Sequence, residues 1–377
     1  MKTPFTFGKI ALDRDFTDRE KETIRLVQNF TSLTHTILIS PRRWGKSSLV
    51  TKASKIALDK NKKLRFCFID LNNVRTEEQF YEYFATEILK VSSTKFESIV
   101  DSAKQLLGRF IPTITVNPTP ESNLQLGLDW SEVKKQPTDI IELAERLAIK
   151  SKTNYIICID EFQNISEFEN PEAFQKILRA HWQKHQNVSY CLYGSKRHML
   201  MDVFTSPSMP FYKFGDIVFL DKISTDDWIK FIVSRFNDTG KKIDNDSAKL
   251  IVDLADRHSY YVQQLAQQTW LRTEVECIND NVTEAFEDLI LQLSMPFQSI
   301  TDGLNNSQIN LLKAVIHNVE QLSSKATIQE YRLGTSANVL KVKKALVNKE
   351  IIDIQNGTVT FLDPFYRYWL KKYFFKT

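Results

Sequence analysis

The chain has 377 residues, of which 42% are hydrophobic and 25% are charged. Only 10 residues are glycine and 11 are proline, and a glycine content so far below the usual ~7% excludes collagen-like, low-complexity and linker-rich chains. At roughly 100–200 residues per domain, the length predicts two or three globular domains.

The net charge of +4 is unevenly distributed along the chain. Residues 301–377 contain 11 Lys and Arg against 6 Asp and Glu, a net charge of +5, which leaves −1 for the rest. A basic end on a nearly neutral body is typical of a protein with an acidic partner such as nucleic acid.

Apolar runs and cysteines indicate the compartment. No apolar run approaches the ~18 residues of a membrane span, and the first residues lack the apolar stretch of a secretory signal. Three of the four cysteines lie in short strand-like runs, and none has C-x-x-C spacing. We therefore expect a cytoplasmic protein with no membrane partner, no disulfide framework and no zinc site.

Over the first 220 residues, strand-like apolar runs alternate with helical patterns. Strands are predicted at 36–39, 64–69, 155–159, 189–193 and 217–220, and helices at 19–30, 47–58, 77–91 and 171–183. Continuous apolar strands separated by helices predict a parallel sheet covered on both faces. Within 109–136, apolar and polar residues alternate around Pro118 and Pro120, which predicts an inserted β-hairpin.

A phosphate-binding pattern follows the first strand. The nine residues are Ser40, Pro41, Arg42, Arg43, Trp44, Gly45, Lys46, Ser47 and Ser48. Residues 40–47 fit GxxxxGK[ST] except that Ser40 replaces the first glycine, and Ser48 comes directly after the pattern. In this pattern backbone N–H groups surround phosphate oxygens, the lysine contacts the β- and γ-phosphates, and the serine hydroxyl binds Mg²⁺. The alternative, chance similarity in a basic turn, is disfavoured by the strand before and the helix after.

Two further strands end in polar residues. The strand 155–159 is followed by Asp160 and Glu161, which predicts that Asp160 joins Ser47 at Mg²⁺ and that Glu161 polarises the attacking water. An ordinary strand end is the alternative. Ser195, after the strand 189–193, is expected to bond the γ-phosphate or the water, or else to cap the next helix. Asp70, after the strand 64–69, has a similar position.

The pattern from 224 to about 300 is wholly helical, with a boundary at 301–303. Helices are then predicted at 308–317, 327–332 and 337–349. Two strands follow at 351–355 and 358–362, joined by Asn356-Gly357, a strong hairpin signal. This is the order of a winged helix, with 337–349 as its recognition helix.

One face of the predicted recognition helix carries Val339, Val342 and Leu346 at helical spacing. Lys341 and Lys344 lie on the opposite face, and with Lys343 they are the candidate DNA contacts. Lysines fit phosphate contact better than base readout. The alternative is a solvated face in a winged helix that binds protein.

With these residues identified, the chain resembles the archaeal-type ATPase family within the AAA+/STAND P-loop NTPases. Besides the phosphate-binding segment, the matching segments are 16–20 (FTDRE), 159–163 (IDEFQ), 194–195 (GS), 210–212 (PFY), 258–263 (HSYYVQ) and 363–370 (DPFYRYWL). The resemblance implies an α/β fold: a parallel-sheet P-loop ATPase core at 1–220 with the inserted hairpin, an α-helical lid at 221–300 and a winged helix at 301–377. It also implies ATP and Mg²⁺ as ligands and catalytic roles for Lys46, Glu161 and Ser195.

The leading functional hypothesis is an ATP-hydrolysing molecular switch. It would couple nucleotide state to binding of DNA, a protein partner or a second copy of the chain. Tyr260 and Tyr261 stand where many AAA+ proteins have a sensor arginine, and together with Ser40 they favour slow turnover. The alternative is a non-catalytic regulator or scaffold that holds nucleotide and binds protein through its winged helix.

Overall fold

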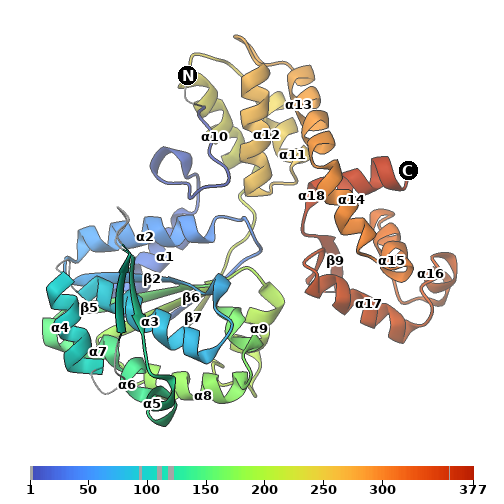
Figure 1. Cartoon of the computed structure of the whole chain (residues 1–377). Helices are drawn as coiled ribbons and strands as arrows, with labels where there is room; N and C mark the ends of the chain where they lie inside the picture. The colour runs from blue at the N-terminus through green and yellow to red at the C-terminus, as the bar shows by residue number, and fades with distance from the viewer. Residues whose placement is uncertain (1–2, 93–95, 108–112, 118–122, 356) are drawn as a thin grey trace. The chain divides into compact units, whose positions relative to one another are not determined.

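The computed structural model describes residues 3–92, 96–107, 113–117, 123–355 and 357–377 (Figure 1). Contacts divide the chain into two compact units, Arg19–Asp221 and the pair of segments Met1–Asp18 and Lys222–Thr377. The first 18 residues, expected in the core, thus group with the helical unit. The reason is apolar packing, because the ring of Phe5 lies against Phe231 and Phe236. The division into three domains stays a prediction.

A five-stranded parallel sheet forms the centre of the unit Arg19–Asp221, as expected. Its strands are β1 (Thr36–Ile39), β2 (Leu64–Asp70), β5 (Asn154–Asp160), β6 (Val188–Gly194) and β7 (Asp216–Phe219). The order across the sheet is β2-β5-β6-β1-β7. The four residues of β1 are all buried, as the continuous apolar run predicted.

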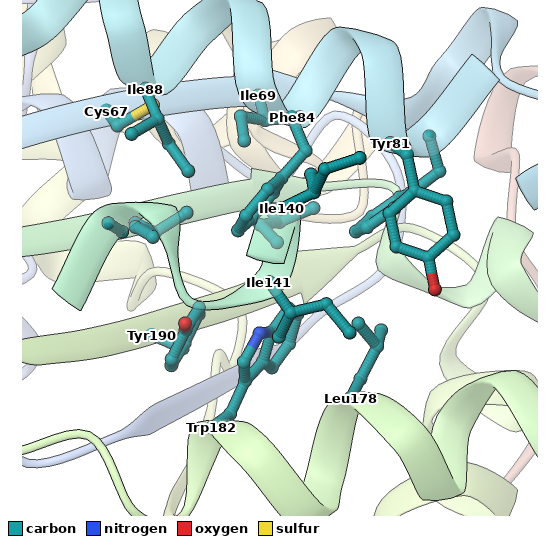
Figure 2. Close-up of a cluster of buried hydrophobic side chains, with 14 of the residues drawn as sticks. Cys67, Ile69, Tyr81, Phe84, Ile88, Ile140, Ile141, Leu178, Trp182 and Tyr190 are labelled. Atoms are coloured by element: carbon teal, nitrogen blue, oxygen red, sulfur yellow. The ribbon is translucent and has the colours of Figure 1, made fainter. Parts of the chain in front are cut away.

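Helices cover both faces of this sheet. Successive residues of a strand point to opposite faces, so the continuous apolar strands place apolar side chains on both of them. The helices are α1 (Glu20–Thr31), α2 (Lys46–Lys60), α3 (Glu77–Ser92), α4 (Phe96–Leu107), α5 (Trp130–Lys135), α6 (Thr138–Ile141), α7 (Leu143–Ser151), α8 (Pro171–Trp182) and α9 (Arg197–Thr205). On one face Phe66 of β2 meets Phe30 of α1. On the other, Figure 2 shows Phe84, Trp182 and Tyr190 gathered with aliphatic side chains, Trp182 stacking on Tyr190 with ring centroids 4.0 Å apart.

The inserted hairpin is confirmed, with strands β3 (Thr113–Asn117) and β4 (Asn123–Gly127). They pair antiparallel with Ile114 opposite Leu126 and Val116 opposite Leu124. Pro118 and Pro120, predicted at the turn, lie outside the described residues. The sequence did not predict the helices α4–α7 on either side of this hairpin.

The second unit is helical from Lys222 to the winged helix, as expected. Its helices before the winged helix are α10 (Thr225–Asn237), α11 (Asn245–Leu254), α12 (Ser259–Arg272), α13 (Asn279–Gln292) and α14 (Ser294–Asp302). Among the described residues, no helix combines the length and the apolar composition needed to cross a membrane.

A winged helix completes this unit. It consists of α15 (Asn306–Ile316), α16 (Lys325–Glu330), α17 (Ser336–Asn348), β8 (Ile352–Gln355), β9 (Thr358–Phe361) and α18 (Pro364–Trp369). Val339, Val342 and Leu346 of α17 are buried, as their spacing predicted. In the β8–β9 turn Gly357 has φ +83°, which favours glycine, while Asn356 lies outside the described residues.

Candidate functional site

Three neighbouring strands bring the predicted site residues of the Arg19–Asp221 unit to one edge of the sheet. β6 pairs with β1 on one side, with Ile39 opposite Gly194, and with β5 on the other. Because the strands are parallel, the segments that begin at Ser40, Asp160 and Ser195 all leave the same edge. The carboxyl edge of a parallel sheet is where open α/β folds bind ligands.

The loop after β1 has the geometry of an anion-binding turn. Arg43 and Gly45 both have left-handed backbones, with φ +66° and +90°, and α2 begins immediately after Gly45. Lys46 is 6% exposed, and its Nζ donates to the carbonyl oxygens of Ser40 at 3.4 Å and Pro41 at 3.1 Å. The ammonium group therefore lies across the loop that would enclose a phosphate.

The backbone at Ser40 explains why serine can replace the first glycine of the phosphate-binding pattern. Ser40 is buried, and its φ is not in the left-handed region, so this backbone does not require glycine. Its hydroxyl donates to the carbonyl oxygen of Pro41 at 3.0 Å. The remaining loop side chains are more open: Arg42 and Arg43 are exposed and Trp44 is half-buried, whereas Ser48 is buried.

Ser47 and Asp160 form the candidate metal site. The Ser47 hydroxyl donates to Asp160 Oδ2 at 3.0 Å. Burial raises the pKa of Asp160 to about 6, with the charge of Glu161 adding to the shift. Two oxygen donors suit Mg²⁺, which keeps much of its shell for water and phosphate oxygens. No group of three or more His, Cys, Asp or Glu that could hold a metal ion occurs in the described part of the chain.

Glu161 is held at Oε2 by three donors. They are Gln163 Nε2 at 2.5 Å, the backbone N–H of Ser195 at 3.2 Å and the Ser195 hydroxyl at 2.9 Å. Burial alone would raise the pKa of Glu161, but these hydrogen bonds outweigh it, so the pKa lies below its usual value. A carboxylate that stays ionised at neutral pH can accept a proton from water.

The side chains of Ser195 and Asp70 make different kinds of hydrogen bond. The Ser195 hydroxyl bonds Glu161, and α9 begins at Arg197 with no side-chain cap, so the capping alternative does not describe its hydrogen bond. Asp70 lies opposite Asp160 in the sheet but is exposed, and its carboxylate accepts from the backbone N–H of Asn72 at 2.9 Å. Asp70 therefore closes a local turn.

Two residues gain importance that the sequence pattern alone did not give them. Gln163 is 1% exposed and bonds Glu161 directly. A Cβ atom at Gly194 would lie 1.9 Å from Gln163 Oε1 and 3.2 Å from Glu161 Cα, so a larger residue there would force the Gln163 side chain to shift. The segment 159–163 drew attention to Gln163 only through the family resemblance, since a glutamine two residues after an acid carries no chemical signature.

The lysines of α17 belong to the second unit. Lys341 and Lys344 are exposed, as expected, while Lys343 is half-buried and its burial lowers its pKa. Lys341 also lines a groove of about 380 Å³ with Asn338 of α17 and Asn306 and Ser307 at the start of α15. Of the described residues that line this groove, Lys341 alone is charged, and the others are neutral.

Comparison with solved structures identifies the fold. The Walker-type ATPase PABY2304 of Pyrococcus abyssi is 16% identical, and the match covers 98% of this chain and 100% of that one with a TM-score of 0.67. The chain has the fold of a Walker-type ATPase. Two further matches each cover 96% of this chain and 94% of the other: the Aeropyrum pernix ORC2 protein in ADPNP–ADP complexes (14% identity, TM-score 0.53) and the Aeropyrum pernix ORC1 protein in complex with DNA (12%, 0.50).

Two comparisons with known proteins add to the structural matches. Residues 295–372 match a family model described as a probable winged helix domain, in agreement with the fold of α15–α18. A search of the curated proteins gave no match. The expected fold class and winged helix are thereby confirmed, whereas the AAA+/STAND subtype stays a prediction.

Proposed function

We propose that the chain binds ATP and Mg²⁺ at the carboxyl edge of its parallel sheet and hydrolyses ATP slowly. The observation that carries this proposal is the convergence of three separate segments: Lys46 on its loop, Ser47 bonded to Asp160, and Glu161 bonded to Ser195. Each group is of the type needed for phosphoryl transfer to water. The ADPNP–ADP complexes of the structurally similar ORC2 protein add support for a nucleotide ligand.

Each residue has a distinct role in the proposed reaction. Residues 40–48 bind the phosphates, and Lys46 balances their negative charge. Ser47 and Asp160 would hold Mg²⁺, which when bound supplies further charge neutralisation at the phosphate oxygens. Glu161 takes a proton from water as the water oxygen bonds the γ-phosphorus and the bond to the β-phosphate oxygen breaks, giving ADP and inorganic phosphate. Ser195 orients Glu161 through two hydrogen bonds.

We further propose that the chain is a molecular switch whose nucleotide state controls binding of DNA or a partner. We infer that α17 contacts the DNA backbone through Lys341 and Lys344, and that Lys343 contributes less because it is half-buried. The ORC1 protein of similar fold is seen in complex with DNA, which supports this assignment. One observation favours the protein-binding alternative: Leu340, beside these lysines, is 65% exposed. The cytoplasm stays our expectation for its location, because the four cysteines are free thiols.

The nucleotide site is tested by equilibrium binding of a fluorescent ATP analogue with Mg²⁺. Wild type is expected to bind, and Lys46→Ala to bind at least tenfold more weakly because it loses the cation at the phosphates. Lys52→Ala, one of several lysines on α2 outside the phosphate loop, is the control and is expected to bind like wild type. Equal binding by wild type and Lys46→Ala would contradict the proposal.

A further inference from the structure

We propose that Gln163 is a positioning residue for hydrolysis: its amide holds Oε2 of Glu161, so that Oε1 is the oxygen that receives the proton from water. This inference rests on the proposed role of Glu161 as the base. It adds a residue to the site and assigns different tasks to the two carboxylate oxygens.

All of the hydrogen bonds that the Glu161 carboxylate accepts from the described residues end on one of its two side-chain oxygens, Oε2. Gln163 Nε2 and both donors of Ser195 converge on Oε2, at 2.5, 3.2 and 2.9 Å. Within the ranges that the structure describes, no hydrogen bond is made to Oε1. A carboxylate oxygen that already accepts three hydrogen bonds is poorly able to accept a proton. The other oxygen of the same group is therefore the base.

The orientation of the Gln163 amide is fixed by its neighbours. An ionised carboxylate only accepts hydrogen bonds, so the amide must present Nε2 to Glu161. Nε2 of Gln163 also lies 3.4 Å from Oδ1 of Asn164. The Nδ2 atom of Asn164 donates to the carbonyl oxygen of Leu71 at 3.0 Å, which fixes the orientation of that amide. Oε1 of Gln163 consequently faces Gly194, where a Cβ atom would lie 1.9 Å from it.

This arrangement leaves a buried acceptor unsatisfied. Oε1 of Gln163 has no hydrogen-bond partner among the described residues, although the side chain is only 1% exposed. Burying an unpaired carbonyl costs stability, and an apolar side chain of the same shape would avoid that cost. An unpaired buried carbonyl does not by itself mark a functional residue, since Gln175 has one as well. Gln163 differs in that its Nε2 donates to Glu161, and that bond is the observation on which the inference rests.

The backbone supports the same assignment. Glu161 has φ +52°, a conformation that non-glycine residues adopt at a cost, and it leads directly into the 3-10 helix Phe162–Glu167. That tight turn brings Gln163 back to the carboxylate two residues earlier. Phe162 anchors the turn, because its ring packs against Phe211 with centroids 5.4 Å apart.

The test compares Gln163→Met with Gln175→Met by steady-state ATP hydrolysis. Gln175 of α8 is equally buried and also has an unpartnered Oε1, so its change to Met alters the same chemistry away from the site. For Gln163→Met we expect kcat to fall about 10- to 100-fold, because a misdirected base loses its near-attack geometry, with KM for ATP and the melting temperature not lowered. Gln175→Met is expected to keep the wild-type kcat.

A second pair of variants shows whether Gln163 acts through Glu161. In a Glu161→Gln background, adding Gln163→Met is expected to cause no further loss of the residual rate. Further loss there, or wild-type kcat in Gln163→Met, would overturn the inference while leaving the proposed function intact. If Gln163→Met does not fold, Gln163→Glu at pH 8 replaces it, with the same expected fall in kcat. A wild type without turnover would remove the proposed function and this inference together.

Discussion

Two adjacent carboxylates at the site, Asp160 and Glu161, have pKa values displaced in opposite directions. Burial and the charge of Glu161 raise the pKa of Asp160 to about 6. Glu161 is also buried, but three hydrogen bonds bring its pKa below the usual value. Neighbouring titratable groups whose environments separate their pKa values generally have separate tasks. In the proposed reaction Asp160 is the group that gains most from a nearby cation, and Glu161 is the one that stays ionised and serves as the base.

The raised pKa of Asp160 makes a pH-dependent prediction about stability. In the unfolded chain an aspartate titrates near 3.9, so above pH 6 the folded protein keeps a charge that its surroundings disfavour. Without Mg²⁺ and nucleotide, Asp160→Asn should therefore raise the free energy of unfolding at pH 8 by up to about 3 kcal/mol. The gain should shrink as pH falls through 6 and vanish below about pH 4. Urea unfolding across this range measures it; a gain equal at all pH values would contradict the argument.

Gly194 gives a second prediction at this scale. Gly194→Ala places a Cβ atom 1.9 Å from Gln163 Oε1, which must displace the glutamine from Glu161. We expect destabilisation of about 1–3 kcal/mol from overpacking and a fall in turnover larger than any loss of ATP affinity. Gly303→Ala is the control, since its Cβ would meet nothing nearer than 3.4 Å and should leave turnover unchanged. Wild-type turnover in Gly194→Ala would show that the close contact is not needed.

At the scale of elements, α17, the predicted recognition helix, is an amphipathic helix with exposed lysines on its outer face. Val339, Val342 and Leu346 are buried, while Lys341 and Lys344 remain exposed. Lysine heads on flexible stems bind phosphate as point charges and fit phosphate contact better than base readout. The element therefore suits binding that depends on salt more than on DNA sequence.

The salt dependence of DNA binding tests this use of α17. Each of Lys341→Ala and Lys344→Ala should reduce the slope of log K against log salt by about 1, because each phosphate contact releases about one counterion. Lys313→Ala on α15 is the matched control, because this lysine lies beside the ring of Phe375 at 5.9 Å. Fluorescence anisotropy with duplex DNA at several salt concentrations measures the slope. A slope unchanged in both α17 variants would assign the helix to a protein partner.

The elements also show how far the sequence determines the structure. The strands of the sheet were predictable because each is a short apolar run between helical patterns, and in β1, β5 and β6 the run leads into the segment that forms the site. The order of the strands across the sheet was not predictable, since no local pattern indicates that β6 lies between β1 and β5. Helix α6 has only four residues, too few to show helical periodicity. The contact between Gln163 and Gly194 joins segments distant in sequence, and its evidence is purely spatial.

At the scale of the whole molecule, the two compact units differ in fold. The unit with the parallel sheet contains the phosphate loop and both carboxylates. The other combines residues of the first segment, the helices α10–α14 and the winged helix in one hydrophobic cluster that extends from Phe5 to Leu370. The lid and winged helix, expected from the sequence as separate regions, therefore share a core.

Asp363 joins these regions and provides a prediction at this scale. Its carboxylate accepts from the N–H groups of Phe365 and Tyr366 at the start of α18, and from the hydroxyl of Tyr261 on α12 at 2.6 Å. Asp363→Ala should cost about 1–3 kcal/mol through lost capping and a buried hydroxyl without its acceptor. Hydrogen exchange should rise in both α12 and α18, the two helices that Asp363 bonds. A rise confined to α18 would show that the two regions open independently.

The most direct test of the account is phosphate release from ATP by wild type and by Glu161→Gln, with ATP binding measured in the same samples. The account predicts slow, Mg²⁺-dependent release by wild type. Glu161→Gln should bind ATP with near wild-type affinity but release phosphate at least about 100-fold more slowly, because it lacks the base. No release by wild type, with or without DNA, or equal release by both proteins, would contradict the assignment of this sheet edge as an ATPase site.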